Sequence, residues 1–405
     1  MFCGHREKGE HMKAFLILED GTIFTGTHFG ADKEIISEIV FNTSMAGYLE
    51  VLTDPSYAGQ AVCMTYPLIG NYGVCLDDME SRRPWPDGFI VREVSRTPSN
   101  FRCDLSLQEF MEQYGIPGIA GIDTRALTRI LREKGTMNGM ITTDEGYDLE
   151  RILPRLHAYR TGNVVDKVTC DEPYYVPGVS KLSDNGPLSG SADFDPEAYK
   201  AGIREKKPSL VRELNGKGKK VALLDLGAKK NIAASLAARG CDVTVYPART
   251  QAIEILSDHP DGIMLSNGPG DPKDCGAIID EAYKLYQSDV PIFAICLGHQ
   301  LMALATGADT YKLKYGHRGG NHPVKELETG RVYISSQNHG YVVDMEKLDP
   351  AVAVPAFINV NDGTNEGLKY TGKNIFTVQF HPEACPGPQD SGSLFDKFIQ
   401  MMEVR

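Results

Sequence analysis

One cysteine stands where an apolar run turns into a helix-like segment. The run is Pro291 to Ile295, the cysteine is Cys296, and PIFAICLGHQLMALATG continues with helical spacing. A thiol on such a strand–turn–helix elbow can be exposed at the end of a sheet, where the dipole and N–H groups of the helix favour the thiolate. Ala294 and Gly298 are the small neighbours that a nucleophile elbow requires. The pattern predicts a nucleophile, with a buried cysteine at the end of a strand as the alternative.

A histidine and a carboxylate follow another apolar run, IFTVQF. His381 comes directly after this run, Pro382 bends the chain, and Glu383 can turn back towards the imidazole. A nucleophilic thiol needs a base, and the base needs an acceptor on its second nitrogen. Alone, HPE is typical of a surface turn; together with Cys296 it favours a Cys–His–Glu triad. His299 lies beside the elbow, and we expect it to be structural because it would begin a helix and point away from the thiol.

Two glycines flank a proline in SNGPGDP, residues 266 to 272, after the run GIML. Gly268 and Gly270 would leave backbone N–H groups bare in a tight loop, which suits the oxyanion of a tetrahedral intermediate. A phosphate-binding or purely structural turn is the alternative. The loop is too short for a P-loop and lacks its lysine, and no G-x-G-x-x-G joins a strand to a helix. Binding of ATP by those routes is therefore not supported.

The elements that would position these groups alternate from residue 220 onwards. KKVALLDLG, CDVTVYPA, GIML and PIFAI are strand-like, and KNIAASLAARG is a short amphipathic helix ended by Gly240. This alternation predicts an α/β fold with a parallel or mostly parallel sheet and helices on both faces. Ligands of such sheets bind at the carboxyl ends of the strands. SNGPGDP, CLGHQ, QNHG and HPE all stand at such ends, so we expect one site there.

The first part of the chain has a different pattern. KAFLILEDG and TIFTGTHFG predict a hairpin turning at Asp20-Gly21, and LSLQEFMEQYG and DTRALTRILREKG predict helices ended by Gly115 and Gly135. These patterns indicate an N-terminal α+β domain. The expected organisation is an extra, disordered leader at 1–11, this domain at 12–170, a linker rich in Pro, Gly, Ser and Asp at 171–218, and the α/β domain at 219–405.

Composition narrows the class of protein. The 405 residues carry a net charge of -12, which argues against general affinity for nucleic acid or anionic membranes, and no stretch approaches the length of a membrane span. Nine scattered cysteines without a C-x-x-C pair indicate a reducing cytoplasm rather than disulfides or a zinc site. We expect His317, His322 and His339 to be hydrogen-bonding residues and no metal to be bound, because no carboxylate or cysteine completes a ligand set.

The motifs together resemble known families. SNGPGDP, AICLGHQ, QNHG and FHPE, in this order, resemble the class I (triad) glutamine amidotransferases. FNTSMAGYLEVLTDPSYAGQ, TYPLIGNYG, AGIDTRALTRILREKG and GHRGGNHPV are similar to the small subunits of carbamoyl-phosphate synthetases. The resemblance runs from about Met12 to the C-terminus and is weakest in the linker. It implies that residues 219–405 have the class I glutamine amidotransferase fold.

The resemblance also implies roles for individual residues. Cys296 would attack the side-chain amide of glutamine to form a glutamyl thioester, His381 would act as base and then acid, and Glu383 would orient it. The N–H of Leu297 would complete the oxyanion hole. The positions that match glutamine contacts are Ser56, Gly268, Gly270, Leu297, Gln300, Asn338, Gly340 and Tyr341, the last often Phe in the family.

The function implied is that of a cytoplasmic glutaminase subunit. Its ammonia would pass to a large subunit that makes carbamoyl phosphate from bicarbonate and two ATP, for arginine and pyrimidine biosynthesis. This chain would need no cofactor, with ATP and Mg²⁺ on the large subunit. Another triad amidotransferase, serving anthranilate, guanylate or cytidylate synthesis, is an alternative that the GYLEVLTDPSY sequence disfavours. A catalytically silent regulatory subunit is another, disfavoured by the intact triad.

Overall fold

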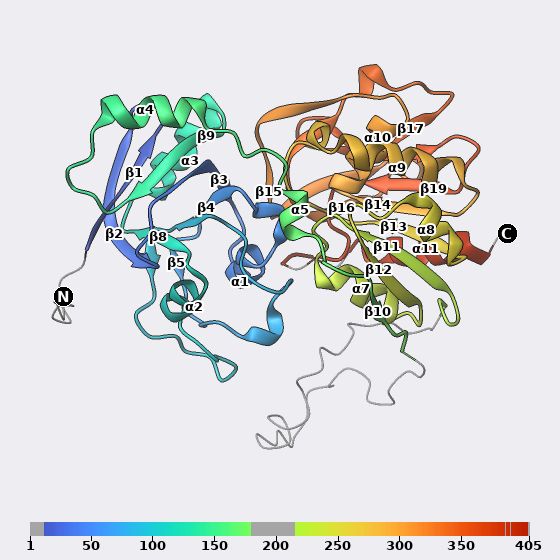
Figure 1. Cartoon of the computed structure of the whole chain (residues 1–405), viewed down its shortest axis with the longest axis horizontal. Coiled ribbons are helices and arrows are strands. Elements are labelled where there is room, and N and C mark those ends of the chain that lie inside the picture. The colour runs from blue at the N-terminus through green and yellow to red at the C-terminus, as the bar shows by residue number, and fades with distance from the viewer. Residues whose placement is uncertain (1–11, 180–214, 385, 389, 404–405) are drawn as a thin grey trace. The chain divides into compact units, whose positions relative to one another are not determined.

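The computed structural model describes residues 12–179, 215–384, 386–388 and 390–403, and the predicted leader at 1–11 lies outside them (Figure 1). The chain divides into two compact units. Within the described residues, the first contains 12–53, 57–76 and 82–161. The second contains everything from 162 onwards together with two short segments, 54–56 and 77–81. Ser56 therefore groups with the second unit although it lies early in the chain.

A closed barrel forms the first unit, with strand order β1-β2-β8-β6-β4-β3-β9. The predicted hairpin is confirmed: β1 and β2 pair antiparallel around Gly21, whose φ of 82° is accessible to glycine. The pairs β3-β4, β4-β6 and β6-β8 are parallel. The barrel strands are β1 Lys13–Leu18, β2 Ile23–Gly30, β3 Ile35–Asn42, β4 Gln60–Met64, β6 Gly88–Ile90, β8 Pro117–Ala120 and β9 Met137–Thr142; β5 Leu68–Ile69 and β7 Glu93–Val94 pair separately.

Four α-helices accompany these strands in the described part of the first unit, so the predicted α+β domain is confirmed. A capping box between Ser106 and Glu109 starts α2, and Gly115 in the left-handed conformation ends it. Gly135 ends α3, as predicted. The helices are α1 Tyr48–Leu52, α2 Leu107–Tyr114, α3 Thr124–Lys134 and α4 Leu149–Ala158.

The second unit is built on a ten-stranded sheet of order β10-β12-β11-β13-β14-β19-β18-β17-β15-β16. Strands β12, β11, β13, β14 and β19 are parallel, and the strands on either side of them pair antiparallel. The α/β fold class is confirmed. The strands are β10 Tyr174–Val176, β11 Lys220–Asp225, β12 Asp242–Pro247, β13 Gly262–Leu265, β14 Ile292–Ile295, β15 Thr310–Glu326, β16 Val332–Val343, β17 Ala353–Asn359, β18 Asn365–Tyr370 and β19 Ile375–Val378.

Helices cover both faces of the parallel strands, as predicted. Successive residues of a strand point to opposite faces. Ile292 and Ala294 of β14 therefore pack in one cluster with residues of α8, α9 and α10, while Phe293 and Ile295 pack in another with residues of α7 and α11. The helices are α5 Val165–Val168, α7 Lys230–Ala237, α8 Ala252–Ser257, α9 Gly276–Gln287, α10 Leu297–Ala305 and α11 Ser393–Glu403.

The structure differs from the sequence prediction at the expected linker, 171–218. Its described residues include β10, which pairs antiparallel with β12 and extends the sheet. Just before it, the Thr169 hydroxyl donates to the carbonyl of Asp225 at 2.6 Å, and the Cys170 N–H donates to the Asp225 carboxylate at 2.7 Å. These bonds explain why the second unit starts at residue 162. The rest of the linker, 180–214, lies outside the described residues.

Two further findings bear on the class of protein. No helix among the described residues combines the length and the apolar character needed to cross a membrane. Seven cysteines are described, and all seven are free. Cys3 and Cys385 lie outside the described residues.

Candidate active site

Cys296 occupies a strained elbow between β14 and α10. Its φ of 52° and ψ of -105° are unusual for a residue with a side chain, and its N–H donates to the carbonyl of Val378 at 2.8 Å. Gly298 allows the close approach that this turn needs, because a Cβ there would lie 2.7 Å from the carbonyl oxygen of Leu265. The strand–turn–helix elbow predicted from the sequence is therefore present.

His381 and Glu383 follow the end of the neighbouring strand β19. Ile295 and Val378 are paired in the sheet, so Cys296 and His381 both lie just past the ends of adjacent parallel strands. The Nδ1 of His381 is 2.6 Å from Oε1 of Glu383, and the two side chains are fully buried. The other ring nitrogen, Nε2, is buried and has no hydrogen-bond partner among the described residues. That nitrogen is therefore available to take up a proton.

The sequence analysis missed a buried lysine in this site. Lys229 lies after the end of β11, and its Nζ is 3.1 Å from Oε1 of Glu383, with both side chains almost completely buried. Burial alone would raise the pKa of Glu383, but Lys229 and then His381 outweigh it and lower that pKa to about 2. Burial likewise opposes the charge on Lys229, yet the carboxylates, Glu383 foremost, raise its pKa. The pairing thus favours the ionised form of both groups. The expectation that functional groups follow strand ends points to this segment. It does not show that Lys229 is the buried lysine and that its neighbour Lys230 is exposed.

The expectation of an exposed thiolate is wrong. Cys296 is only 2% exposed, and burial raises the pKa of its thiol to about 12. The charges of Asp54 and Glu383 act in the same direction, whereas Lys229 and the N–H of Leu297 oppose them. The sulfur lies 3.7 Å from the carbonyl oxygen of Asn338, to which it donates. Burial thus favours the protonated thiol before substrate binds.

The SNGPGDP loop follows β13 and borders the elbow. Gly268 admits no side chain, because a Cβ would lie 2.2 Å from the carbonyl oxygen of Leu226, and Gly270 has a φ of 94°. Asn267 is completely buried and donates from Nδ2 to the hydroxyl of Ser56 at 2.9 Å. Asn267 thus joins the loop to Ser56, which lies 211 residues earlier in the chain.

Other positions predicted to contact glutamine are joined by hydrogen bonds around the elbow. The Gln300 side chain donates to the carbonyl of Tyr341 at 2.8 Å and to the amide oxygen of Gln379 at 3.0 Å. The Asn338 side chain donates to Asp54 at 3.0 Å. Leu297 begins α10, and Gly340 and Tyr341 lie on β16. The structure thus brings these residues together around the thiol, and their contacts with glutamine stay a prediction.

His299 has the structural role that the sequence predicted. Its Nδ1 lies 2.7 Å from the hydroxyl of Thr377, and burial lowers the pKa of the ring to about 3. A ring that is neutral near pH 7 and hydrogen-bonded to Thr377 of β19 is poorly suited to compete with His381 as the base.

The sequence analysis expected no metal because no carboxylate or cysteine completes a ligand set. That premise is wrong, because a carboxylate lies beside two of the three histidines named there. Glu366 on β18 lies with His317 and His339, and each of the three offers a ligand atom within 4.8 Å of the others. The residues are far apart in sequence and meet only because β15, β16 and β18 belong to one sheet.

The comparisons with known proteins now define the class. Residues 222–401 match the family model described as glutamine amidotransferase class-I, so the second unit carries a domain of that class. Residues 16–141 match the model described as carbamoyl-phosphate synthase small chain, CPSase domain. The chain belongs to the family of carbamoyl phosphate synthase small chains.

The similarity to individual relatives extends over nearly the whole chain. The carbamoyl phosphate synthase small chain of Clostridium perfringens is 48% identical over 389 residues, which cover 96% of this chain and 99% of that one. The corresponding protein of Listeria innocua is 47% identical over 393 residues, covering 97% and 98%. Among solved structures, a glutamine amidotransferase from Thermotoga maritima matches 41% of this chain and 76% of its own, with 18% identity and a TM-score of 0.34.

Proposed function

We propose that the chain hydrolyses L-glutamine through Cys296, His381 and Glu383 and passes the ammonia to a large subunit. The observation that carries this proposal is the strained Cys296 elbow beside a His381–Glu383 pair at the ends of adjacent strands. The three side chains have the types and the order of a thiol nucleophile, its base and an orienting acceptor.

The first half of the reaction forms a thioester. Because the Cys296 thiol is protonated, Nε2 of His381 takes its proton as the sulfur attacks the side-chain amide carbon of glutamine. The oxyanion faces the N–H of Leu297 and the backbone of the Gly268–Gly270 loop. His381 then gives its proton to the leaving nitrogen, the C–N bond breaks, and ammonia and the glutamyl thioester remain.

The second half returns the enzyme to its starting state. His381 removes a proton from a water molecule, whose oxygen attacks the thioester carbon. When the C–S bond breaks, the sulfur takes the proton back from His381 and glutamate leaves. Throughout, Glu383 accepts the Nδ1–H of His381 and stabilises the imidazolium, while Lys229 keeps Glu383 ionised.

The substrate would be held by the residues already gathered around the elbow. We assign glutamine contacts to Ser56, Gly268, Gly270, Leu297, Gln300, Asn338, Gly340 and Tyr341. Several of these are fixed by bonds to one another or to neighbours, so the site would be formed before glutamine arrives.

The fate of ammonia implies a partner. Ammonia released into neutral water becomes ammonium and loses its nucleophilic lone pair, so direct transfer to the next active site has a clear chemical advantage. The large subunit would bind ATP and Mg²⁺ and make carbamoyl phosphate from bicarbonate and two ATP, in the cytoplasm, for arginine and pyrimidine biosynthesis. The proposed role of this chain requires no cofactor of its own.

The test is glutamate release from glutamine by the purified chain, with and without a carbamoyl phosphate synthase large subunit supplied with ATP and bicarbonate. We expect slow release by the chain alone and a strong increase with the partner. Release that ignores the partner would support the triad and contradict the partner assignment. No release under either condition would contradict the proposed activity.

A further inference from the structure

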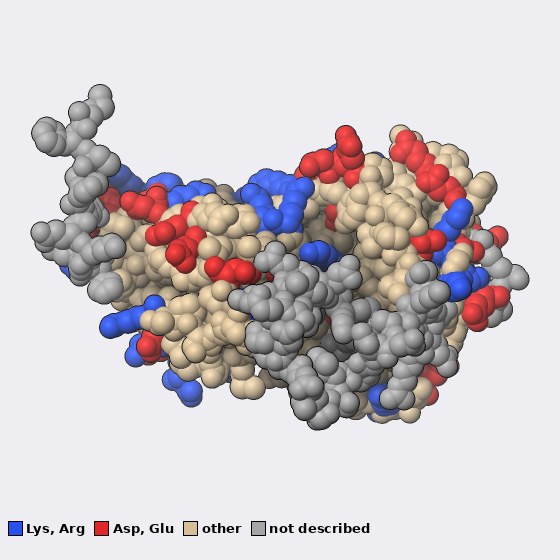
Figure 2. All heavy atoms as spheres, turned by 90° about the horizontal axis from the view of Figure 1, so that it is seen from below, with Lys and Arg blue, Asp and Glu red and all other residues tan. Residues whose placement is uncertain are grey.

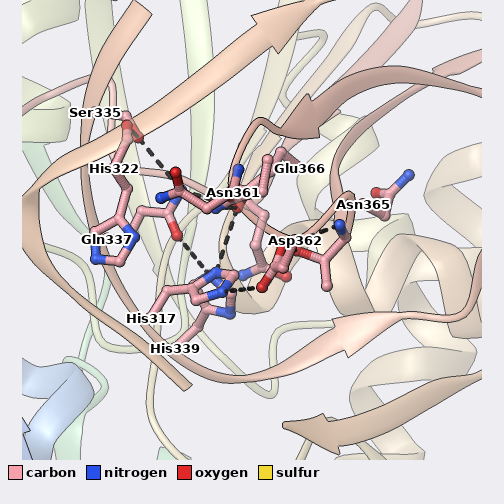
Figure 3. A network of polar contacts seen from close by, with 12 residues as sticks. His317, His322, Ser335, Gln337, His339, Asn361, Asp362, Asn365 and Glu366 are labelled. Atoms are coloured by element: carbon pink, nitrogen blue, oxygen red, sulfur yellow. Dashed lines mark hydrogen bonds and ion pairs between the residues drawn. The ribbon is translucent and has the colours of Figure 1, made fainter. Parts of the chain in front are cut away.

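A polar cluster lies on the antiparallel side of the sheet, where β15, β16 and β18 come together (Figure 3). His317 belongs to β15, His339 to β16 and Glu366 to β18. All three side chains are buried, and Glu366 is completely inaccessible. None of the three has a part in the reaction proposed above.

His317 is oriented as a metal ligand is. Its Nε2 lies 2.8 Å from the carboxylate of Asp362, and its Nδ1 lies 3.4 Å from Oε1 of Glu366 with no hydrogen-bond partner among the described residues. Histidines that bind metals usually donate one ring N–H to a carboxylate or carbonyl and present the other nitrogen to the ion. Asp362 supplies that acceptor, which leaves Nδ1 as the ligand atom.

His339 shows the same pattern and an unresolved contact. Its Nδ1 lies 2.9 Å from the carbonyl of Tyr341, and its Nε2 lies 3.0 Å from the amide oxygen of Gln337. A neutral ring that donates from Nδ1 turns the lone pair of Nε2 towards another acceptor.

Reversing the Gln337 amide does not remove this conflict. Its nitrogen donates to Oε1 of Glu366 at 2.9 Å, and a reversed amide would place its oxygen against that carboxylate instead. Oε1 of Glu366 also accepts from Asn359, while its Oε2 is buried without a partner among the described residues. With both rings neutral, as metal-bound imidazoles are, the cluster has more acceptors than donors, and a cation is the group that would satisfy it.

We propose that His317, His339 and Glu366 form a binding site for a divalent metal ion of the zinc type. Two imidazoles and a carboxylate are a ligand set suited to Zn²⁺, and Gln337 offers an oxygen beside them. Ligands about 2.05 Å from a tetrahedral ion lie about 3.3 Å apart. The 3.4 Å separation between His317 Nδ1 and Glu366 Oε1 agrees with that spacing.

The proposed ion would act on the sheet and take no part in the reaction. On β16, His339 is next to Asn338, whose carbonyl accepts the hydrogen bond of the Cys296 thiol. The same strand contains Ser336, whose carbonyl accepts the N–H of His381 at 2.9 Å. Joining β15, β16 and β18 through one ion would hold this edge of the thiol site in place. The inference does not depend on the proposed glutaminase reaction.

The test uses the full chain, stripped with a chelator and titrated with Co²⁺ in place of Zn²⁺. We expect one equivalent to bind and give the visible bands of tetrahedral cobalt, without the thiolate-to-cobalt absorption that cysteine ligands produce. Addition of Zn²⁺ should displace the cobalt and raise the thermal unfolding temperature. Folded wild-type chain that gives no such bands overturns the proposal and indicates that protons alone balance the cluster.

Matched variants locate the ion. Glu366→Gln keeps the size of the side chain and removes its charge, and it should weaken cobalt binding by about tenfold or more. His322→Gln is the control, because the His322 ring lies 5.2 Å from that of His317 and is outside the ligand set. It should bind as the wild type does. Undiminished binding by folded Glu366→Gln, or equal losses in both variants, contradicts this site.

Discussion

Proton transfer at the single residue Cys296 controls the proposed chemistry. Its thiol is buried with a pKa raised to about 12, so very little thiolate exists before substrate arrives. The ion pair of Lys229 with Glu383 keeps a negative charge on the acceptor of His381. His381 can then receive the thiol proton while an oxyanion forms nearby. The reactive sulfur would thus be formed only in the complex with glutamine.

Cys296→Ser should separate the two activities of the assembled synthetase. The hydroxyl is a much weaker nucleophile under these conditions, so glutamine-dependent carbamoyl phosphate synthesis should be lost. Synthesis from added ammonium should persist, because that route bypasses the thiol. Both rates can be measured on the reconstituted complex. Loss of both would show that Cys296 has a structural role in the complex.

Lys229→Met should destabilise the folded chain and weaken glutaminase activity. It leaves the Glu383 carboxylate buried without its cation, and breaking a buried ion pair typically costs about 3–5 kcal/mol. Denaturant unfolding followed by circular dichroism measures the loss. Lys230→Met is the matched control, because Lys230 is adjacent and exposed, and it should change the unfolding free energy by less than about 0.5 kcal/mol. Equal effects of the two substitutions would contradict the role given to the ion pair.

The residues that sequence could identify are those carried by short local motifs. Cys296, His381 and Glu383 each stand directly after an apolar run, so their meeting follows from the parallel sheet. Lys229 also follows a strand, but periodicity does not show which of two adjacent lysines is buried. Glu366 belongs to an ordinary-looking strand, and its neighbours in space come from strands far away in sequence. The burial of Lys229 and the neighbours of Glu366 both depend on how distant segments come together in the fold, which a single sequence does not show.

At the scale of elements, the position of helix α10 depends on how closely it packs against β13. Gly298 lies in its first turn, where a Cβ would come within 3 Å of three atoms of Leu265 and Ser266. The contacts are to backbone oxygens and a Cβ, so the helix itself would have to move. Such a shift would carry Cys296 with it.

Gly298→Ala should therefore lower both stability and activity. Overpacking typically costs about 1–3 kcal/mol, and the displaced thiol should reduce glutamate release by about tenfold or more. Gly276→Ala is the control, because Gly276 begins α9 with no atom within 4 Å of an added Cβ. It should be neutral or slightly stabilising. Unfolding curves and glutamate release on both variants provide the comparison, and an active, stable Gly298→Ala would refute this view of the elbow.

The direction of strands was harder to predict than their existence. Apolar runs located β11, β13, β14 and β19, and the helices between them required parallel pairing. QNHG was also expected at the end of a strand of this parallel sheet, but it lies within β16, which pairs antiparallel with β15 at the edge of the sheet. β10 lies in a stretch whose composition indicated a linker, yet its backbone completes hydrogen bonds of β12. Composition describes side chains, whereas edge pairing depends on the backbone.

At the scale of the whole molecule, exposed charges and buried charges contribute differently to stability. The sequence carries a net charge of -12, and Figure 2 shows acidic and basic side chains interspersed on the face it displays. Exposed pairs such as Lys369 with Glu328, both more than half exposed, contribute little to stability because water screens them. Lys229 and Glu383 are shielded from water, so their ionisation is coupled to folding.

This coupling predicts how acid should affect the chain. Glu383 has a pKa of about 2 when folded, below its usual 4.5, so its ionised form favours folding. The stabilisation should be complete above pH about 4.5 and should disappear as the pH falls towards about 2. Glu383→Gln lacks this titrating group, so the difference in unfolding free energy between wild type and variant should be constant near neutrality and shrink in acid. Denaturant unfolding at several pH values, with the exposed Glu328→Gln as control, measures it. A difference that stays the same across this range would mean that the folded-state pKa of Glu383 is not depressed.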